Sequence, residues 1–178
     1  MHHWERDYPI QWGRSIFCIF PKCINYWLVR DNPNSNASNV RWKLNISGNV
    51  DLYKGAKIVV MPDAVLTICG GTYINEYSRI FCRKRIFIGA SCSIAWNVCI
   101  MDTDLHKIYD GENLINPNAD VYVGNNVWIG ANSFIGKGVN IKNNSILGAY
   151  TIASKDIANG FIHTGIPSHP VKQFTKWF

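Results

Sequence analysis

Three residues with acid–base chemistry lie close together in one polar stretch of the sequence. Asp102, Asp104 and His106 form the pattern D-x-D-x-H at the start of MDTDLHKIYDGENLINPNADVY. An imidazole is the usual general base near neutral pH, and a carboxylate can orient the ring and stabilise its protonated form. We therefore predict that His106 is a general base and that Asp102 or Asp104 is its partner. Taken alone, this pattern is more often a solvated loop or a cap than a site, so its place in the fold decides between the two interpretations.

The residues after this stretch repeat with a period of six. One aliphatic residue or Ala returns at every sixth position, and a second series follows four residues after each member. The first series is Val123, Ile129, Ile135, Ile141, Leu147 and Ala153, and the second is Val127, Ser133, Val139, Ser145, Thr151 and Ile157. Six is three strand periods, so both series can point inward from short strands that meet at a corner. Pairs such as Asn125-Asn126 and Lys137-Gly138 tolerate the left-handed backbone of tight corners.

This period predicts an all-β fold, a parallel β-helix over residues 40–160. Three six-residue units close a triangular coil, and hexapeptide repeats are typical of such helices. Antiparallel hairpins would instead need longer alternating runs and wider turn spacing. Upstream, the period continues through Ile68, Ile74 and Ile80 and through Ile88, Ile94 and Ile100. The eight residues between Ile80 and Ile88 predict a two-residue corner insertion around Cys82–Arg85.

The repeat breaks between Ile100 and Val123. These residues are 23 positions apart, which is not a multiple of six. We expect an extruded loop over residues 101–122, because solenoids tolerate insertions at corners and functional residues concentrate on such loops. The position of His106 in this loop favours the catalytic interpretation.

The two ends of the chain lie outside the repeat. Ser15–Arg30 is apolar and aromatic and is interrupted at Pro21, which predicts a short helical segment that caps the first coil. The alternative is an interfacial helix that contacts the inner face of a membrane. We therefore divide the chain into a capping segment and linker (1–39), the β-helix (40–160) and a C-terminal tail (161–178).

Composition narrows the function classes. The 178 residues suit a single domain, and no apolar run of membrane-spanning length is present. The six Cys form no C-x-x-C pair and the N-terminus lacks a signal-peptide layout, so we expect a reducing cytoplasm. The net charge of +6 fits an anionic ligand or acidic glycan. No nucleic-acid-binding motif accompanies it, and we expect neither a nucleic-acid partner nor a metal.

Taken together, these motifs resemble the hexapeptide-repeat acyltransferases, the left-handed β-helix enzymes that include maltose and galactoside acetyltransferases. The chain is most similar to bacterial polysaccharide and sugar O-acetyltransferases. The resemblance rests on the hexads Val123–Ile157, on the D-x-D-x-H loop, on ASKDI (Ala153–Ile157) and on TGIPSHPVK (Thr164–Lys172). It covers about residues 68–172.

The resemblance implies a left-handed β-helix. It also implies an acetyl-CoA-dependent enzyme that acetylates a sugar hydroxyl of a polysaccharide or its precursor. In this family a loop His removes the hydroxyl proton, and His106 occupies that place. A backbone N–H of the resuming coil, from Gly130 or Ala131, would stabilise the oxyanion. The family also implies a homotrimer with each active site between two solenoids.

Further residues are assigned through the same resemblance. The positions that match coenzyme A contacts are Ala131, Gly148, Ala149, Ser154, Lys155 and Lys172. His169 stands where the family often has Arg, which weakens one expected phosphate contact. Asn75, Asn97 and Trp128 are candidates for binding the acceptor. The alternatives are that both Asn residues are structural corner residues and that Trp128 packs on a surface or interface.

Three other functions stay open at this point. An acetyltransferase for an amino acid or a sugar amine would use the same fold and donor, although the long helical domain of serine acetyltransferases is absent. A γ-type carbonic anhydrase would need three converging His ligands, and His106, His163 and His169 show no paired-ligand spacing. A non-catalytic scaffold would leave the Asp–His loop without a role.

Overall fold

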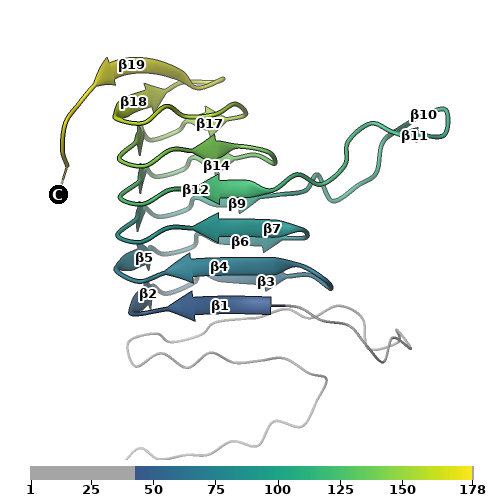
Figure 1. Cartoon of the computed structure of the whole chain (residues 1–178), viewed down its shortest axis with the longest axis horizontal. Helices are drawn as coiled ribbons and strands as arrows, with labels where there is room; N and C mark the ends of the chain where they lie inside the picture. The colour runs from purple at the N-terminus through teal and green to yellow at the C-terminus, as the bar shows by residue number, and fades with distance from the viewer. Residues whose placement is uncertain (1–42, 178) are drawn as a thin grey trace, which may run out of the picture.

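The structure is a computed structural model that describes residues 43–177. The predicted capping segment, its helix and its membrane contact lie outside the described residues. Within the described range the chain forms a parallel β-helix, in which three parallel sheets run along the stack of coils (Figure 1). The all-β, parallel β-helix prediction is therefore confirmed.

Five coils each contribute one strand to each sheet, and β18 and the antiparallel β19 extend the second sheet. The first sheet contains β1 (Lys43–Ser47), β4 (Val65–Cys69), β7 (Arg85–Ile88), β12 (Val121–Val123) and β15 (Asn140–Ile141). The second contains β2 (Val50–Leu52), β5 (Thr72–Ile74), β8 (Ser93–Ile94), β13 (Trp128–Ile129), β16 (Ile146–Leu147), β18 (Phe161–Thr164) and β19 (His169–Gln173). The third contains β3 (Lys57–Val60), β6 (Arg79–Cys82), β9 (Cys99–Met101), β14 (Phe134–Ile135) and β17 (Ile152–Ala153).

The inward residues are those that the six-residue period predicts. Both series between Val123 and Ile157 are buried, and the upstream isoleucines Ile68, Ile88 and Ile100 are completely buried in the same core. Parallel pairing places like residues on top of each other, as Ile129 on Ile94. Because the coil is narrow, this single aliphatic column for each sheet supplies the hydrophobic core.

Small polar residues in the second series have a structural purpose. Ser133 donates its hydroxyl hydrogen to the carbonyl oxygen of Gly148 and accepts the N–H of Thr151. At another corner, the Thr72 hydroxyl donates to the carbonyl oxygen of Gly89 and accepts the N–H of Cys92. A tight corner leaves backbone groups without a ladder partner, and buried unpaired groups are costly. The hydroxyls satisfy these groups inside the core.

The predicted corners are observed. The second residue of each predicted pair has a positive φ: Asn126, Asn132, Gly138, Asn144 and Tyr150. Asn side chains also link successive corners, as where Asn143 Oδ1 accepts the N–H of Asn125. The insertion around Cys82–Arg85 lengthens β6 and β7, and it leaves Arg83 and Lys84 at the corner between them.

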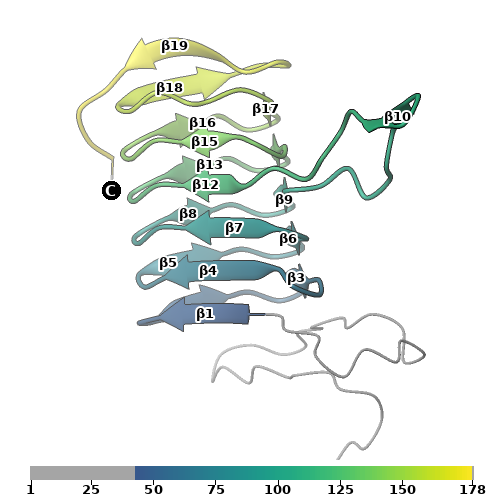
Figure 2. The ribbon, with the colours of Figure 1, turned by 45° about the vertical axis from the view of Figure 1, so that its right-hand side comes forward.

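Two segments depart from the regular coil. The chain leaves the stack after β9 and returns at β12, and the excursion carries a small antiparallel pair, β10 (Tyr109–Asp110) and β11 (Asn113–Leu114). Figures 1 and 2 show this loop projecting to one side of the stack. At the C-terminal end, β19 turns back antiparallel on β18 and covers the last coil. Among residues 43–177 no helix is long and apolar enough to span a bilayer.

Candidate active site

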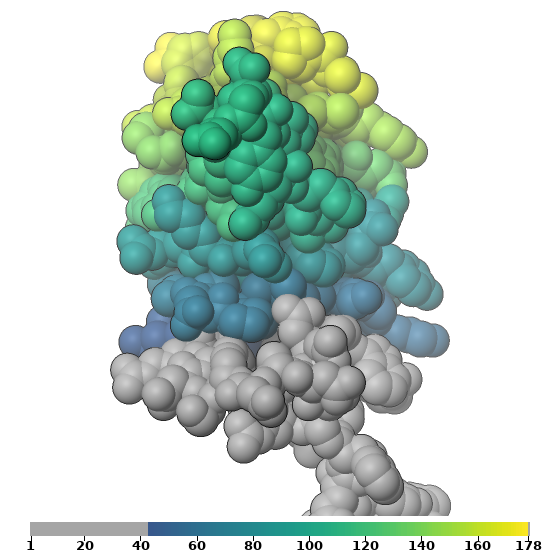
Figure 3. All heavy atoms as spheres, turned by 90° about the vertical axis from the view of Figure 1, so that its right-hand side faces the viewer, coloured from purple at the N-terminus to yellow at the C-terminus, as the bar shows by residue number. Residues whose placement is uncertain are grey.

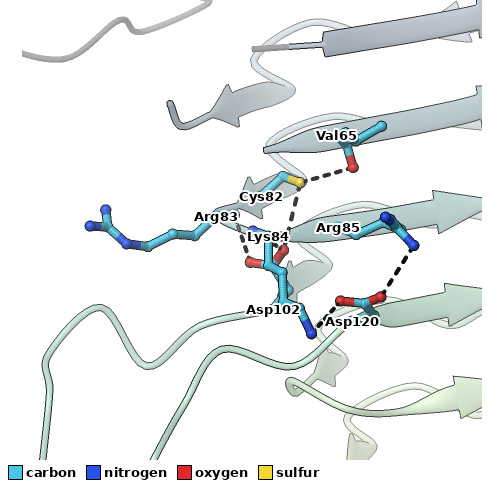
Figure 4. Close-up of polar contacts among 7 residues, drawn as sticks. All are labelled: Val65, Cys82, Arg83, Lys84, Arg85, Asp102 and Asp120. Carbon is cyan, nitrogen blue, oxygen red and sulfur yellow. Dashed lines mark hydrogen bonds and ion pairs between the residues drawn. The ribbon is translucent and has the colours of Figure 1, made fainter. Parts of the chain in front are cut away.

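The base of the projecting loop is anchored by Asp102. Its side chain is fully buried, and its two oxygens accept the N–H groups of Arg83 and Lys84, each at 2.7 Å (Figure 4). Its backbone oxygen accepts the N–H of Ala119, which closes the loop at its neck. Asp102 thus caps the inserted corner of the coil below.

The surroundings of Asp102 are structural in character. The thiol of Cys82 lies 3.6 Å from Asp102 Oδ2 and 3.3 Å from the carbonyl oxygen of Val65. Burial and then the neighbouring Asp102 carboxylate raise the pKa of this thiol to about 12, so it is inert near neutral pH. Asp120 sits beside this corner and pairs with Lys84 at 2.9 Å.

Asp104 lies on the exposed side of the same neck. Its carboxylate forms an ion pair with Lys137, which belongs to the next coil, and accepts a hydrogen bond of 3.0 Å from Asn116 Nδ2. The hydrogen bond from Lys137, and then the one from Asn116, lower the pKa of Asp104. The carboxylate is therefore ionised at neutral pH.

Asn116 completes the fastening of the segment around His106. Its Nδ2 also donates to the carbonyl oxygen of His106 at 2.8 Å, and its Oδ1 accepts the N–H of Ile108 at 2.6 Å. Sequence reasoning missed both Asn116 and Lys137. The Asn116-Pro117 dipeptide was a turn signal, whereas nothing in the sequence indicated that the Lys137 corner would meet Asp104.

The side chain of His106 is exposed, and its backbone is held. The N–H of His106 donates to the carbonyl oxygen of Asp104 at 2.8 Å, but its ring makes no hydrogen bond with residues 43–177. Figure 3, which faces this side of the molecule, shows the loop standing out in front of the coils. The segment is thus fixed at its backbone while the imidazole is free to meet a substrate. Its pairing with Asp102 or Asp104 stays a prediction.

Most of the predicted donor-binding residues border the third sheet. Ala131, Gly148 and Ala149 lie at the corner before its strands β14 and β17. Ser154 and Lys155 lie at the corner after β17, and both are exposed. The five residues therefore frame one face of the upper coils.

Two details refine this set. The N–H of Gly130 donates to the carbonyl oxygen of Leu147 at 2.8 Å, whereas the N–H of Ala131 bonds to no residue in 43–177. Of the two candidates for stabilising an oxyanion, only Ala131 has an available donor. Lys172 lies on β19, at the end of the second sheet, so it is placed on a different face from Lys155.

The predicted acceptor-binding residues already have structural partners. Asn97 has a positive φ, and its Nδ2 donates to Asn132 Oδ1 at 2.6 Å. Asn75 Nδ2 donates to the carbonyl oxygen of Ile94 at 3.2 Å. Trp128 packs against Trp177 with ring centroids 6.1 Å apart. The structural role considered for each residue is therefore observed, and its contact with an acceptor stays a prediction.

The described residues contain no group of three or more His, Cys, Asp or Glu side chains that could hold a metal ion. Candidate functional groups within residues 43–177 include the imidazole of His106, the backbone donor of Ala131 and the framing residues of the third sheet.

Comparison with known proteins gives consistent matches. A family model described as bacterial transferase hexapeptide (six repeats) matches residues 120–152. The polysialic acid O-acetyltransferase of Neisseria meningitidis is 40% identical over 120 residues, which cover 62% of this chain and 54% of that protein. The chain spans about half the length of the curated relatives it matches.

Two solved structures extend the match. That of the polysialic acid O-acetyltransferase OatWY has a TM-score of 0.63 and 32% identity, and the match covers 76% of this chain and 71% of that one. That of galactoside acetyltransferase in complex with coenzyme A has a TM-score of 0.56 and 25% identity, with 75% and 65% covered.

Proposed function

We propose that this chain, which belongs to the hexapeptide-repeat (left-handed β-helix) acyltransferase family, transfers an acetyl group from acetyl-CoA to a hydroxyl group of a sugar. Relatives of this fold are O-acetyltransferases of polysialic acid and galactosides, and one neighbour was solved with coenzyme A. The acceptor would be a polysaccharide or its precursor, and His106 would be the general base.

A single observation carries this proposal. The loop that interrupts the hexads holds His106 by its backbone, through Asn116 and the Asp104–Lys137 ion pair, and leaves the ring without a partner in residues 43–177. A purely structural loop gains nothing from an exposed, pre-positioned imidazole. A general base requires one.

The chemistry follows from these residues. The imidazole of His106 removes the proton of the acceptor hydroxyl as its oxygen attacks the thioester carbonyl carbon, so a C–O bond forms. The Ala131 N–H is the candidate donor to the developing oxyanion. The C–S bond then breaks, and the coenzyme A sulfur takes the proton back from the imidazolium. No covalent acyl-enzyme is needed.

Homotrimer formation would complete the site. The loop projects away from its own coils (Figure 2), and the upper strands of the third sheet, β14 and β17, present half-buried apolar side chains outward, with Phe134 beside Ile152. A neighbouring copy that covers β14 and β17 would bury those side chains and bring its loop to the donor-binding frame.

We also propose a cytoplasmic location, because the buried free thiols of Cys82 and Cys92 suit a reducing compartment.

The proposal is tested by incubating the purified protein with acetyl-CoA and a panel of sugars. The release of free coenzyme A thiol is followed over time. We expect thiol release that depends on a hydroxylated sugar, and an ester product that alkali removes. An amide product, stable to alkali, would shift the assignment to a sugar-amine or amino-acid acetyltransferase. Absence of both acetyl-CoA binding and turnover would favour a scaffold role.

A further inference from the structure

Three exposed aromatic rings follow one edge of the lower coils. Tyr53, Tyr77 and Trp96 have 45%, 61% and 57% of their surfaces exposed. They lie on successive coils at the corner that joins the second sheet to the third. The N–H of Tyr77 donates to the carbonyl oxygen of Lys54, and that of Asn97 donates to Glu76, so these corners stack directly. The three rings occupy different positions of this corner, because Tyr53 is level with Asn75, Trp96 with Glu76, and Tyr77 with Gly55 and Asn97. They form a staggered cluster on three successive coils, which are spaced by about 4.8 Å.

The backbone at Tyr77 fixes where its ring stands. Tyr77 has a φ of 60°, the corner conformation that Asn97 and Asn132 adopt higher on the same edge. Asn is comfortable there, whereas a bulky side chain is an outlier. The Tyr77 ring lies over Gly55, where an added Cβ would come within 2.6 Å of it. The strained backbone of Tyr77 thus holds an exposed ring in a fixed place.

Cations flank this cluster of rings. Lys54, Lys57 and Arg79 are exposed and form no ion pair with any residue in 43–177. Lys57 and Arg79 are also direct neighbours in the β3–β6 register, although like charges placed opposite each other destabilise a sheet. Two acidic residues lie nearby, Glu76 at the corner and Asp51 on β2. The local balance is therefore positive.

We propose that this aromatic edge, formed by Tyr53, Lys54, Lys57, Tyr77, Arg79 and Trp96, binds an extended chain of acidic sugars. Aromatic faces suit the C–H faces of sugar rings, and the cations suit the carboxylate of each acidic unit. The cluster extends over three coils to Trp96, which adjoins Asn97, a candidate acceptor contact. The inference rests on the proposed function and deepens it. The acceptor is a polymer whose length lies along several coils, and only one unit reaches His106.

The upper part of the same edge provides a contrast. Its next corner carries Ala131 and Asn132, so the cluster of rings ends there, and Tyr150 lies one coil further on. Tyr150 has the same positive φ and a similarly exposed ring, but no exposed cation is placed beside it at the starts of β14 or β17. It therefore offers a matched control for the Tyr77 position.

The test measures binding separately from catalysis. Full-length protein with His106→Ala is titrated with a fluorescent polysialic acid oligomer, and with polygalacturonate, dextran and single-stranded DNA for comparison. We expect both acidic glycans to bind and neutral dextran to bind at least about tenfold more weakly. Tyr77→Asn, which suits the backbone conformation, and Arg79→Gln should each weaken binding of the acidic glycans by about fivefold to tenfold. Tyr150→Asn and the charge control Lys142→Gln should not.

The outcomes distinguish failure of the glycan-binding edge from failure of the proposed acetyltransferase function. If the edge variants bind the acidic oligomers as tightly as their parent does, or if Tyr150→Asn weakens binding as much as Tyr77→Asn, the edge is not the site. Preference for DNA over both glycans would identify the edge as a polyanion surface and overturn the proposal. Glycan binding that depends on Tyr77, without any acetyl transfer by wild-type protein, would support the edge while contradicting the proposed function.

Discussion

The coil stack and the projecting loop use their residues in opposite ways. From Val121 to Ile157 every inward position of the repeat is buried, while residues 104–115 of the loop are all exposed. The boundary falls between two carboxylates that are two residues apart. Asp102 is buried and caps a corner of the stack, and Asp104 is exposed and pairs with Lys137. The spacing of the D-x-D-x-H motif therefore does not assign a role to either Asp. Each role follows from whether the Asp lies in the buried stack or in the exposed loop.

The largest effect should come from the loop. His106→Ala should lower acetyl transfer by about 100-fold or more, because an alcohol needs a base to attack at neutral pH. The thermal unfolding midpoint should be unchanged, since the ring has no partner in residues 43–177. Initial rates of thiol release measure the first quantity and calorimetry the second.

Glu112→Gln, at the exposed tip of the same loop, is the matched control and should keep wild-type turnover. Near-normal turnover by the His106→Ala protein would remove His106 from the mechanism and leave the loop as a structural excursion.

The two carboxylates give the second test. Asp102→Ala should reduce the free energy of unfolding by about 3 kcal/mol, because the buried carboxylate is lost and two partly buried N–H groups lose their acceptors. Asp104→Ala should reduce it by less than about 1 kcal/mol, because its ion pair is exposed, yet should lower turnover by loosening the segment that holds His106. Urea unfolding and steady-state kinetics on both variants measure these differences. Equal stability losses would contradict the boundary between stack and loop.

A smaller effect is expected at the donor-binding frame. Lys155→Ala should weaken acetyl-CoA binding by about fivefold, more at low salt than at high salt, through loss of a phosphate contact. Lys142→Ala, at another corner of the same coils, is the control and should bind as wild type does. Calorimetric titration at two salt concentrations decides between them, and an unchanged affinity would take Lys155 out of the site.

The smallest effect concerns the closing coil. His163 occupies the inward column above Leu147, is 5% exposed, and neither ring nitrogen has a partner in residues 43–177. Burial, and then the neighbouring His169, lower the pKa of His163 from its ordinary value of 6.5. The unfolded chain therefore binds a proton below pH 6.5 that the folded chain does not, so stability is full above this pH and declines as pH falls.

His163→Leu should remove this decline and add about 1 kcal/mol of stability, because an apolar side chain suits the column. Unfolding midpoints at about pH 7.5 and about pH 5 measure it. The same loss of stability on acidification in wild type and variant would show that His163 is not its source.

Much of the fold was predictable because hexad periodicity is local. From Val123 to Ile157 the inward residues and corner pairs could be counted from the sequence, as could the two-residue insertion near Cys82, and the Asn and Gly corners adopt the positive φ that their side chains allow. The extruded loop was also predictable, since a gap that is not a multiple of six must leave the coil. The fastening of His106 by Asn116 and Lys137 was not, because it joins Asn116 to His106 across the loop and Lys137 of a later corner to Asp104.

The sequence by itself determined the parallel β-helix, the place of the loop and the exposure of a His within it, because these follow from repeat length and from where the repeat fails. Only the tertiary structure decided that Asp102 belongs to the core and that the N–H of Ala131 remains available. It also decided that rings and cations from successive coils meet on one edge. Stacking brings residues about one coil apart in sequence into contact, and their partners depend on the register of the whole stack.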